Sequence, residues 1–126
     1  MENNENIELL KKFIGWADEK KAENIIKLEI AEVSNFADAI LVCSGTGDLH
    51  VKAIAENILE KAKAEKILLA GKEGFDSGDW ILLDFHQIIV HIFREEIREQ
   101  YDLEGFWKER IKLYEERNHD KKNNQE

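Results

Sequence analysis

The order of helical and strand-type patterns along the chain constrains its fold more than any other feature. Apolar residues recur at helical spacing over residues 7–18 and about 48–63, and shorter apolar runs typical of strands occupy residues 25–30, 39–43, 67–70, 80–83 and 88–93. A last helix is predicted from Arg94 to about Arg117. This order predicts a single α+β (mixed α/β) domain, with helices packed on a mixed sheet of about five strands.

The first two predicted strands differ in their expected depth. In the first, Ile26, Leu28 and Ile30 alternate with polar residues, which indicates a half-exposed strand. The second, residues 39–43, is apolar throughout and therefore more central. Residues 44–48 break this strand and start the next helix, with Thr46 or Asp48 as the expected N-cap.

Residues 80–83 and 88–93 read as the two arms of a hairpin. Residues 84–87 carry no Gly or Asn for a tight turn, so the loop length is only weakly specified. A two- or four-residue loop would place Trp80 opposite His91 and Leu83 opposite Ile88, and a three-residue loop would shift that register. We favour the first arrangement, which puts Trp80 and His91 side by side on an exposed face.

The C-terminal part of the chain is expected to be less regular. The apolar stripe of the last helix is ragged over residues 102–105, where Gly105 weakens a helix and predicts a kink or break. Residues 118–126 are polar and predict a disordered tail after a folded domain of residues 1–117.

Composition limits the classes of partner. The chain has 126 residues, with 18 Lys and Arg against 27 Asp and Glu, a net charge of −9. This balance disfavours nucleic acid as the main partner and favours a basic protein. The polar start, the lack of a long apolar run and the single Cys43 predict a cytoplasmic protein without membrane contact or internal disulfide.

No arrangement of residues predicts catalysis, a metal site or a cofactor. Ser44-Gly45 before a helix is similar to a phosphate-holding element of nucleotidyltransferases, but Asp76 and Asp79 are spaced wrongly for their paired metal ligands. The four His residues fall in separate segments. A plain strand-to-helix turn is the favoured interpretation, and residual nucleotide binding remains the alternative.

Trp80 and His91 each have two interpretations. Trp80 either closes the edge of the core or is exposed as an interface anchor, where Trp is enriched. His91 is either a satisfied structural side chain or a polar group that meets a partner.

Taken in order, these segments resemble the ribosomal silencing factor family, also called the Iojap family. The resemblance covers roughly residues 7–108 and is carried by Ala37-Asp38, Ser44-Gly45-Thr46, His50 to Ala55, Glu73-Gly74, Trp80, Leu82-Leu83-Asp84, Val90 to Phe93, Arg98, Tyr101, Leu103-Glu104 and Trp107. No single piece is specific, but the order and spacing are.

The resemblance implies a nucleotidyltransferase-like topology without the catalytic carboxylates, and a protein that is not an enzyme. It implies binding to the large ribosomal subunit through ribosomal protein fourteen, which blocks joining of the small subunit. Related mitochondrial members act in large-subunit assembly, and homodimers are common. We expect a binding surface with Trp80 as anchor and with Glu73, Leu82, Asp84, His91, Arg98, Tyr101 and Glu104 around it.

Overall fold

The computed structural model describes the backbone of residues 4–124 and the side chains of residues 6–118. The elements are α1 (Asn4–Glu19), β1 (Glu23–Glu29), β2 (Ala39–Gly45), α2 (Asp48–Ala64), β3 (Gly71–Glu73), β4 (Trp80–Asp84), β5 (Ile88–Arg94), α3 (Glu95–Tyr101) and α4 (Leu103–Asn124). They form one five-stranded sheet in the order β1-β2-β5-β4-β3. Only β2 and β5 pair in parallel, which confirms the predicted mixed sheet and α+β class.

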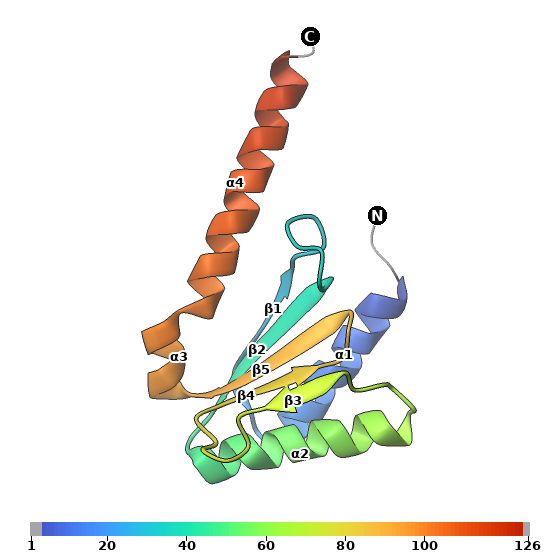
Figure 1. Ribbon diagram of the computed structural model, residues 1–126, viewed down its shortest axis with the longest axis vertical. Helices are drawn as coiled ribbons and strands as arrows, with labels where there is room; N and C mark the ends of the chain where they lie inside the picture. Colours follow the sequence, from blue (N-terminus) through green and yellow to red (C-terminus); the bar gives the residue numbers. More distant parts are fainter. Residues whose placement is uncertain (1–3, 125–126) are drawn as a thin grey trace.

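One face of the sheet is fully covered by α1 and α2 (Figure 1). The apolar stripe predicted for α2, which includes Val51, Ile54 and Ile58, packs against alternate residues of β2, β4 and β5. Every residue of β2 is buried, as expected for a central strand. This side holds the larger core.

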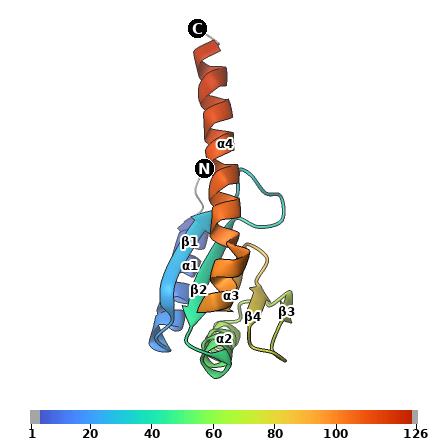
Figure 2. The same cartoon turned by 90° about the vertical axis from the view of Figure 1, so that its left-hand side faces the viewer.

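The other face of the sheet is covered only in part. Trp107 of α4 packs with Leu28, Ile40 and Val42 of β1 and β2, and Ile97 of α3 adds to the cluster. Figure 2 shows α3 and the start of α4 standing over this side of the sheet, next to β2. Among the described residues, α3 reaches β4 on this side only at the start of that strand, where Tyr101 packs on Trp80, and the rest of β4 and β3 is left without a covering helix (Figure 1).

The predicted hairpin forms, but its predicted register is wrong. Trp80 lies opposite Phe93, and Leu82 lies opposite His91, so the pairing is shifted by two residues from the predicted register and residues 85–88 lie between the last partners, Asp84 and Ile89. The loop closes because the Asp84 carboxylate accepts a hydrogen bond from the backbone N–H of His86, which takes a positive φ of 71°. Residues other than glycine rarely adopt this conformation, so residues 84–87 carry no clear turn signal.

Two further predictions need correction. Residues 67–70 are not a strand, because β4 ends at Asp84 and the ladder therefore begins only at its partner Gly71. The N-cap of α2 is Gly47, without a side-chain hydrogen bond, instead of Thr46 or Asp48.

The last predicted helix is broken into α3 and α4. The break lies at Asp102, which adopts a left-handed conformation with φ 46°, three residues before Gly105. Beyond its base, α4 rises clear of the sheet (Figure 1). It continues across residue 118, the expected start of the tail, as far as Asn124, because no Gly or Pro interrupts residues 106–124. Residues 125–126 of the predicted tail lie outside the described residues.

Candidate partner-binding face

Residues of the half-covered sheet face form three rows, because opposite residues in paired strands point to the same side. The rows are Trp80–Phe93–Ser44, then Glu73–Leu82–His91–Val42, then Asp84–Ile89–Ile40. The sheet therefore brings five predicted binding residues to one face. Of these, Trp80, Leu82 and Asp84 are partly exposed and Glu73 is exposed. We call these four residues the open half-face.

Trp80 is held in place from three sides. Its ring stacks on Phe93 at 4.8 Å between centroids, and Tyr101 of α3 lies 4.9 Å away on the ring centroids. Its indole N–H donates a hydrogen bond of 3.0 Å to Nδ1 of His91. Both interpretations of Trp80 are thus partly right, because the side chain closes the second core cluster and still reaches solvent.

His91 contacts Trp80 although the two residues are not directly opposite. His91 faces Leu82, and Trp80 is two residues along the same strand, so the contact is diagonal. His91 is only 6% exposed, so its prediction as an exposed partner contact is wrong. Burial lowers the pKa of His91 to about 4. The ring is therefore neutral near pH 7, which leaves Nδ1 free to accept the indole hydrogen bond.

Arg98 also acts inside the protein. It is 5% exposed, and its guanidinium donates to both carboxylate oxygens of Glu104 and to the hydroxyl of Ser44 at 2.7 Å. These bonds connect α3, the start of α4 and the end of β2. Arg98 and Glu104 therefore position the helices beside the open half-face, whereas Tyr101 is 58% exposed at its border.

A charged group beside Trp80 was missed by the sequence analysis. Arg94, at the end of β5, donates hydrogen bonds of 2.7 Å to Asp79 and to Glu96. The hydrogen bond and charge of Asp79 raise the pKa of Arg94. The signal was present, because Asp79 directly precedes Trp80, but only the observed register, with Trp80 opposite Phe93, brings Asp79 next to Arg94.

The phosphate-holding element considered above is occupied by the protein's own groups. The hydroxyl of Ser44 is fully buried beneath Arg98. The backbone N–H of Thr46 donates to Nδ1 of His50, whose Nε2 lies 2.7 Å from the backbone oxygen of Lys20. A phosphate would have to displace these bonds, which argues against the nucleotide-binding alternative.

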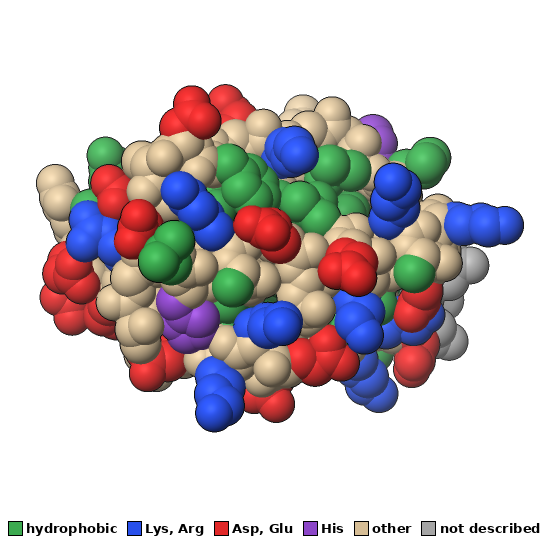
Figure 3. Space-filling view, turned by 90° about the horizontal axis from the view of Figure 1, so that it is seen from below, with side chains coloured by type: hydrophobic (Ala, Val, Ile, Leu, Met, Phe, Trp, Pro, Cys, Tyr) green, Lys and Arg blue, Asp and Glu red, His purple; other side chains and the backbone are tan. Residues whose placement is uncertain are grey.

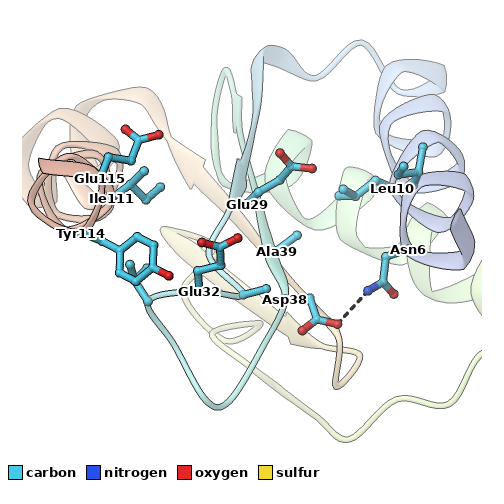
Figure 4. A pocket seen from close by; sticks show the side chains of 12 residues that line it. Asn6, Leu10, Glu29, Glu32, Asp38, Ala39, Ile111, Tyr114 and Glu115 are labelled. Atoms are coloured by element: carbon cyan, nitrogen blue, oxygen red, sulfur yellow. Dashed lines mark hydrogen bonds between the residues drawn. The ribbon is translucent and has the colours of Figure 1, made fainter. Parts of the chain in front are cut away.

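Two hollows flank the base of α4. The first, of about 660 Å³, lies between the start of α1 and α4, and its rim carries Glu29, Glu32, Asp38 and Glu115 (Figure 4). Asn6 donates a 2.7 Å hydrogen bond to Asp38 there. The second, of about 920 Å³, lies between the β1–β2 loop and the other side of α4. Neither includes a residue predicted for the binding site.

The face seen from below, where α2 lies, mixes acidic and basic side chains without segregating one sign (Figure 3).

No group of His, Cys, Asp and Glu among the described residues could hold a metal ion. Burial raises the pKa of the Cys43 thiol to about 12, so this side chain remains a neutral core group. Within the described part of the chain, no helix is long and apolar enough to cross a bilayer.

These features define an α+β domain with one helix-covered sheet face and one face left half open around a fixed tryptophan. The family model described as RsfS, ribosomal silencing factor during starvation, matches residues 3–126. The chain therefore belongs to the ribosomal silencing factor family.

Individual relatives agree with this assignment. The ribosomal silencing factor RsfS of Bacillus subtilis is 37% identical over 99 residues, which are 79% of this chain and 84% of the relative. A crystal structure from Chromobacterium violaceum superimposes with a TM-score of 0.78 at 30% identity, over 79% of this chain and 83% of that one. A mouse protein named mitochondrial assembly of ribosomal large subunit protein 1 is 27% identical over 71% of this chain and 40% of its own length.

Proposed function

We propose that this protein represses translation by binding the large ribosomal subunit through ribosomal protein fourteen. Its bulk then blocks joining of the small subunit. Family membership supports a role in silencing ribosomes. The mechanism is steric, so it needs a binding surface and no catalytic group.

The observation that carries the proposal is the open half-face. Three of its residues are partly exposed on β4, whose other face packs in the larger core through Ile81 and Leu83; they are Trp80, Leu82 and Asp84. A tryptophan fixed before binding loses little conformational freedom when a partner docks, and Trp is enriched among residues that dominate interface energies.

The charge of the surface indicates the kind of partner. Glu73 and Asp84 flank Leu82 on the same face, and the whole chain carries a net charge of −9. Ribosomal proteins that lie on RNA are commonly basic, so such a partner would be attracted to this face. We infer that Glu73 and Asp84 contact Lys or Arg side chains of ribosomal protein fourteen.

The test is co-sedimentation with purified large subunits, together with binding to isolated ribosomal protein fourteen. Tyr101→Ala and the charge reversal Glu73→Lys should weaken both by about ten-fold, since each removes or opposes one contact. The matched control is Glu56→Lys, an exposed residue on the outer side of α2, and it should bind normally.

Subunit joining is then measured by adding small subunits and recording joined ribosomes in a sucrose gradient. The protein should lower the joined fraction in proportion to the occupancy of large subunits. Binding to large subunits without loss of joining would refute the blocking mechanism. Equal binding by Glu73→Lys, Tyr101→Ala and the control would refute the proposed face.

A role in large-subunit assembly is the second candidate, favoured by the printed name of the mouse relative. It uses the same face on an immature particle. The two roles separate in cells that lack the protein, since assembly predicts accumulation of large-subunit precursors during growth. Silencing alone predicts normal subunits and excess translation in starvation.

We further propose that the protein acts in the cytoplasm as a non-enzymatic regulator without a cofactor, and that it can form a homodimer. Sedimentation velocity over a range of concentrations tests self-association. Thermal stability with and without nucleoside triphosphate and magnesium tests the nucleotide-binding alternative, for which no shift is expected.

A further inference from the structure

The second hollow beside α4 is lined by both aromatic and arginine side chains. It lies between the β1–β2 loop and α4, and four aromatic residues line it: Phe36 from the loop, and Phe106, Trp107 and Tyr114 from α4. Trp107 is buried, with Phe36 at 5.9 Å and Phe106 at 5.3 Å between ring centroids. Phe36 and Phe106 are 57% and 54% exposed, so two hydrophobic rings flank the groove in contact with water.

Two arginines line the same groove. The guanidinium of Arg110 lies 5.6 Å from the ring centroid of Phe106 and 6.0 Å from that of Trp107. Arg117 lies two helical turns further along the same side of α4. Glu32 is the one carboxylate among the lining residues, and Glu109 and Glu116 fall on the neighbouring strip of the helix.

The arginines of the chain divide into two kinds. Arg94 and Arg98 both form ion pairs with carboxylates near the open half-face. Among the residues whose side chains are described, no carboxylate lies within ion-pair distance of Arg110 or Arg117. The groove therefore combines exposed aromatic rings with guanidinium groups that form no ion pair with any carboxylate of the described side chains.

We propose that this groove binds a single-stranded segment of RNA. A nucleotide supplies a flat base for Phe36 or Phe106 and a phosphate for Arg110 or Arg117, and single strands are recognised by this combination of stacking and positive charge. An acidic peptide would satisfy the arginines but would leave both exposed rings without a stacking partner. The contact involves only the few residues of this groove and does not depend on the base sequence. It is therefore compatible with the acidic net charge of the whole chain.

The experiment is fluorescence anisotropy of a labelled, mixed-sequence RNA of about twelve nucleotides, a length within the range that such grooves accommodate. The full chain is titrated at 50 and 200 mM KCl. We expect saturable binding that weakens at the higher salt, because phosphate contacts release counterions. This measurement needs no ribosome, so its outcome is independent of the proposed binding to the large subunit.

Substitutions then locate the contact. Phe106→Ala and Arg110→Ala should each weaken RNA binding by about five-fold or more. The matched control, Lys112→Ala, removes a positive charge from another side of the same helix and should bind nearly as the unaltered chain does. Circular dichroism verifies folding, which Phe106→Ala should preserve since its ring is largely exposed.

Three outcomes would overturn the proposal. One is the absence of saturable RNA binding at 50 mM KCl. A second is equal binding by Phe106→Ala, Arg110→Ala and Lys112→Ala. The third is a loss of large-subunit binding by Phe106→Ala without any RNA binding, which would assign the groove to a protein partner instead.

Discussion

Trp80 packs against the second core cluster and also reaches solvent, so its substitution should affect both stability and binding. Its ring stacks on Phe93 and its N–H bonds to the buried His91, so Trp80→Ala would remove packing and leave Nδ1 of His91 without a donor. A purely exposed anchor, one of the two interpretations of Trp80 from the sequence, would leave folding nearly unchanged on this substitution. The structure instead indicates a loss of about 2 kcal/mol of stability, because a half-buried ring is removed.

Tyr101 provides a cleaner test of the face. It is 58% exposed and covers one side of Trp80, so Tyr101→Ala should reduce stability by less than about 0.5 kcal/mol. If Tyr101 contacts the partner, the same change should weaken binding to the large subunit by about ten-fold. Urea unfolding and co-sedimentation of the same sample measure the two effects. Normal binding per folded molecule by both Tyr101→Ala and Trp80→Ala would contradict the assignment of this face.

The buried imidazole of His91 makes stability depend on pH. Its pKa is about 4 in the folded protein against an ordinary value of 6.5, so the unfolded chain takes up a proton first as the pH falls. The contribution is fully present above pH 6.5 and is lost as the pH falls toward 4, by about 3 kcal/mol in all. Protonation also removes the acceptor for the Trp80 N–H.

The measurement is urea unfolding at pH 7.0, 5.5 and 4.5 for the unaltered chain and for His91→Asn. The asparagine amide can retain an acceptor near the position of Nδ1 but does not titrate. The stability difference between the two proteins should therefore shrink toward low pH. A constant difference across this range would show that His91 is accessible to protons in the folded state.

At the residue scale, the sequence predicts which side chains share a face of the sheet better than it predicts how deeply each one is buried. The pairing of Trp80 with His91 on one face follows from strand periodicity, which holds for a diagonal contact as well as a direct one. The burial of His91 depends on hairpin register, and the register depends on His86 at a positive φ. No local signal in residues 84–87 specifies that conformation.

At the scale of elements, the side chain of Arg98 connects α3 and α4 to each other and to the sheet, beside the apolar contacts of Ile97 and Trp107. Arg98 connects Glu104 to Ser44, and Asp102 turns the chain between the two helices. The ragged pattern at residues 102–105 predicted a break, but not that Arg98 lies under it. That position could not be read from the sequence, because it requires knowing that β2 ends beneath α3.

Arg98→Met should destabilise the protein by about 3 kcal/mol, since it leaves the Glu104 carboxylate buried without its partner. The double variant Arg98→Met, Glu104→Met should recover part of this loss, because no unpaired charge then remains. Urea unfolding of the single and double variants measures the coupling. Additive losses in the double variant would mean that the two side chains do not act as a pair.

At the scale of the whole molecule, the packing of helices on one face of the sheet can be predicted from the sequence, whereas the length of the projecting helix α4 cannot. The apolar run of residues 39–43 and the stripe of α2 are sufficient to predict a sheet with a helix-covered face. The length of α4 was missed because residues 118–124 have no apolar stripe, so burial gives no sign of a helix there. Helix propensity alone continues it, in the absence of Gly or Pro.

The far end of α4 is separable from both the core and the proposed binding face. The helix has 22 residues, and its last contribution to the second core cluster is Ile111. It rises away from the sheet beyond its base (Figure 1). A chain that ends at Arg117 should therefore lose less than about 0.5 kcal/mol of stability, since Ile111 and the rest of the second core cluster are retained.

The shortened chain should also sediment with large subunits as the full chain does, because Trp80 and its neighbours lie on the sheet and not on the distal helix. Urea unfolding and co-sedimentation at matched concentrations measure the two properties. A control that ends at Gly105 removes Trp107 from the second cluster and should unfold at markedly lower urea. If the chain ending at Arg117 folds normally but loses large-subunit binding, the distal helix is part of the interface and the proposed face is incomplete.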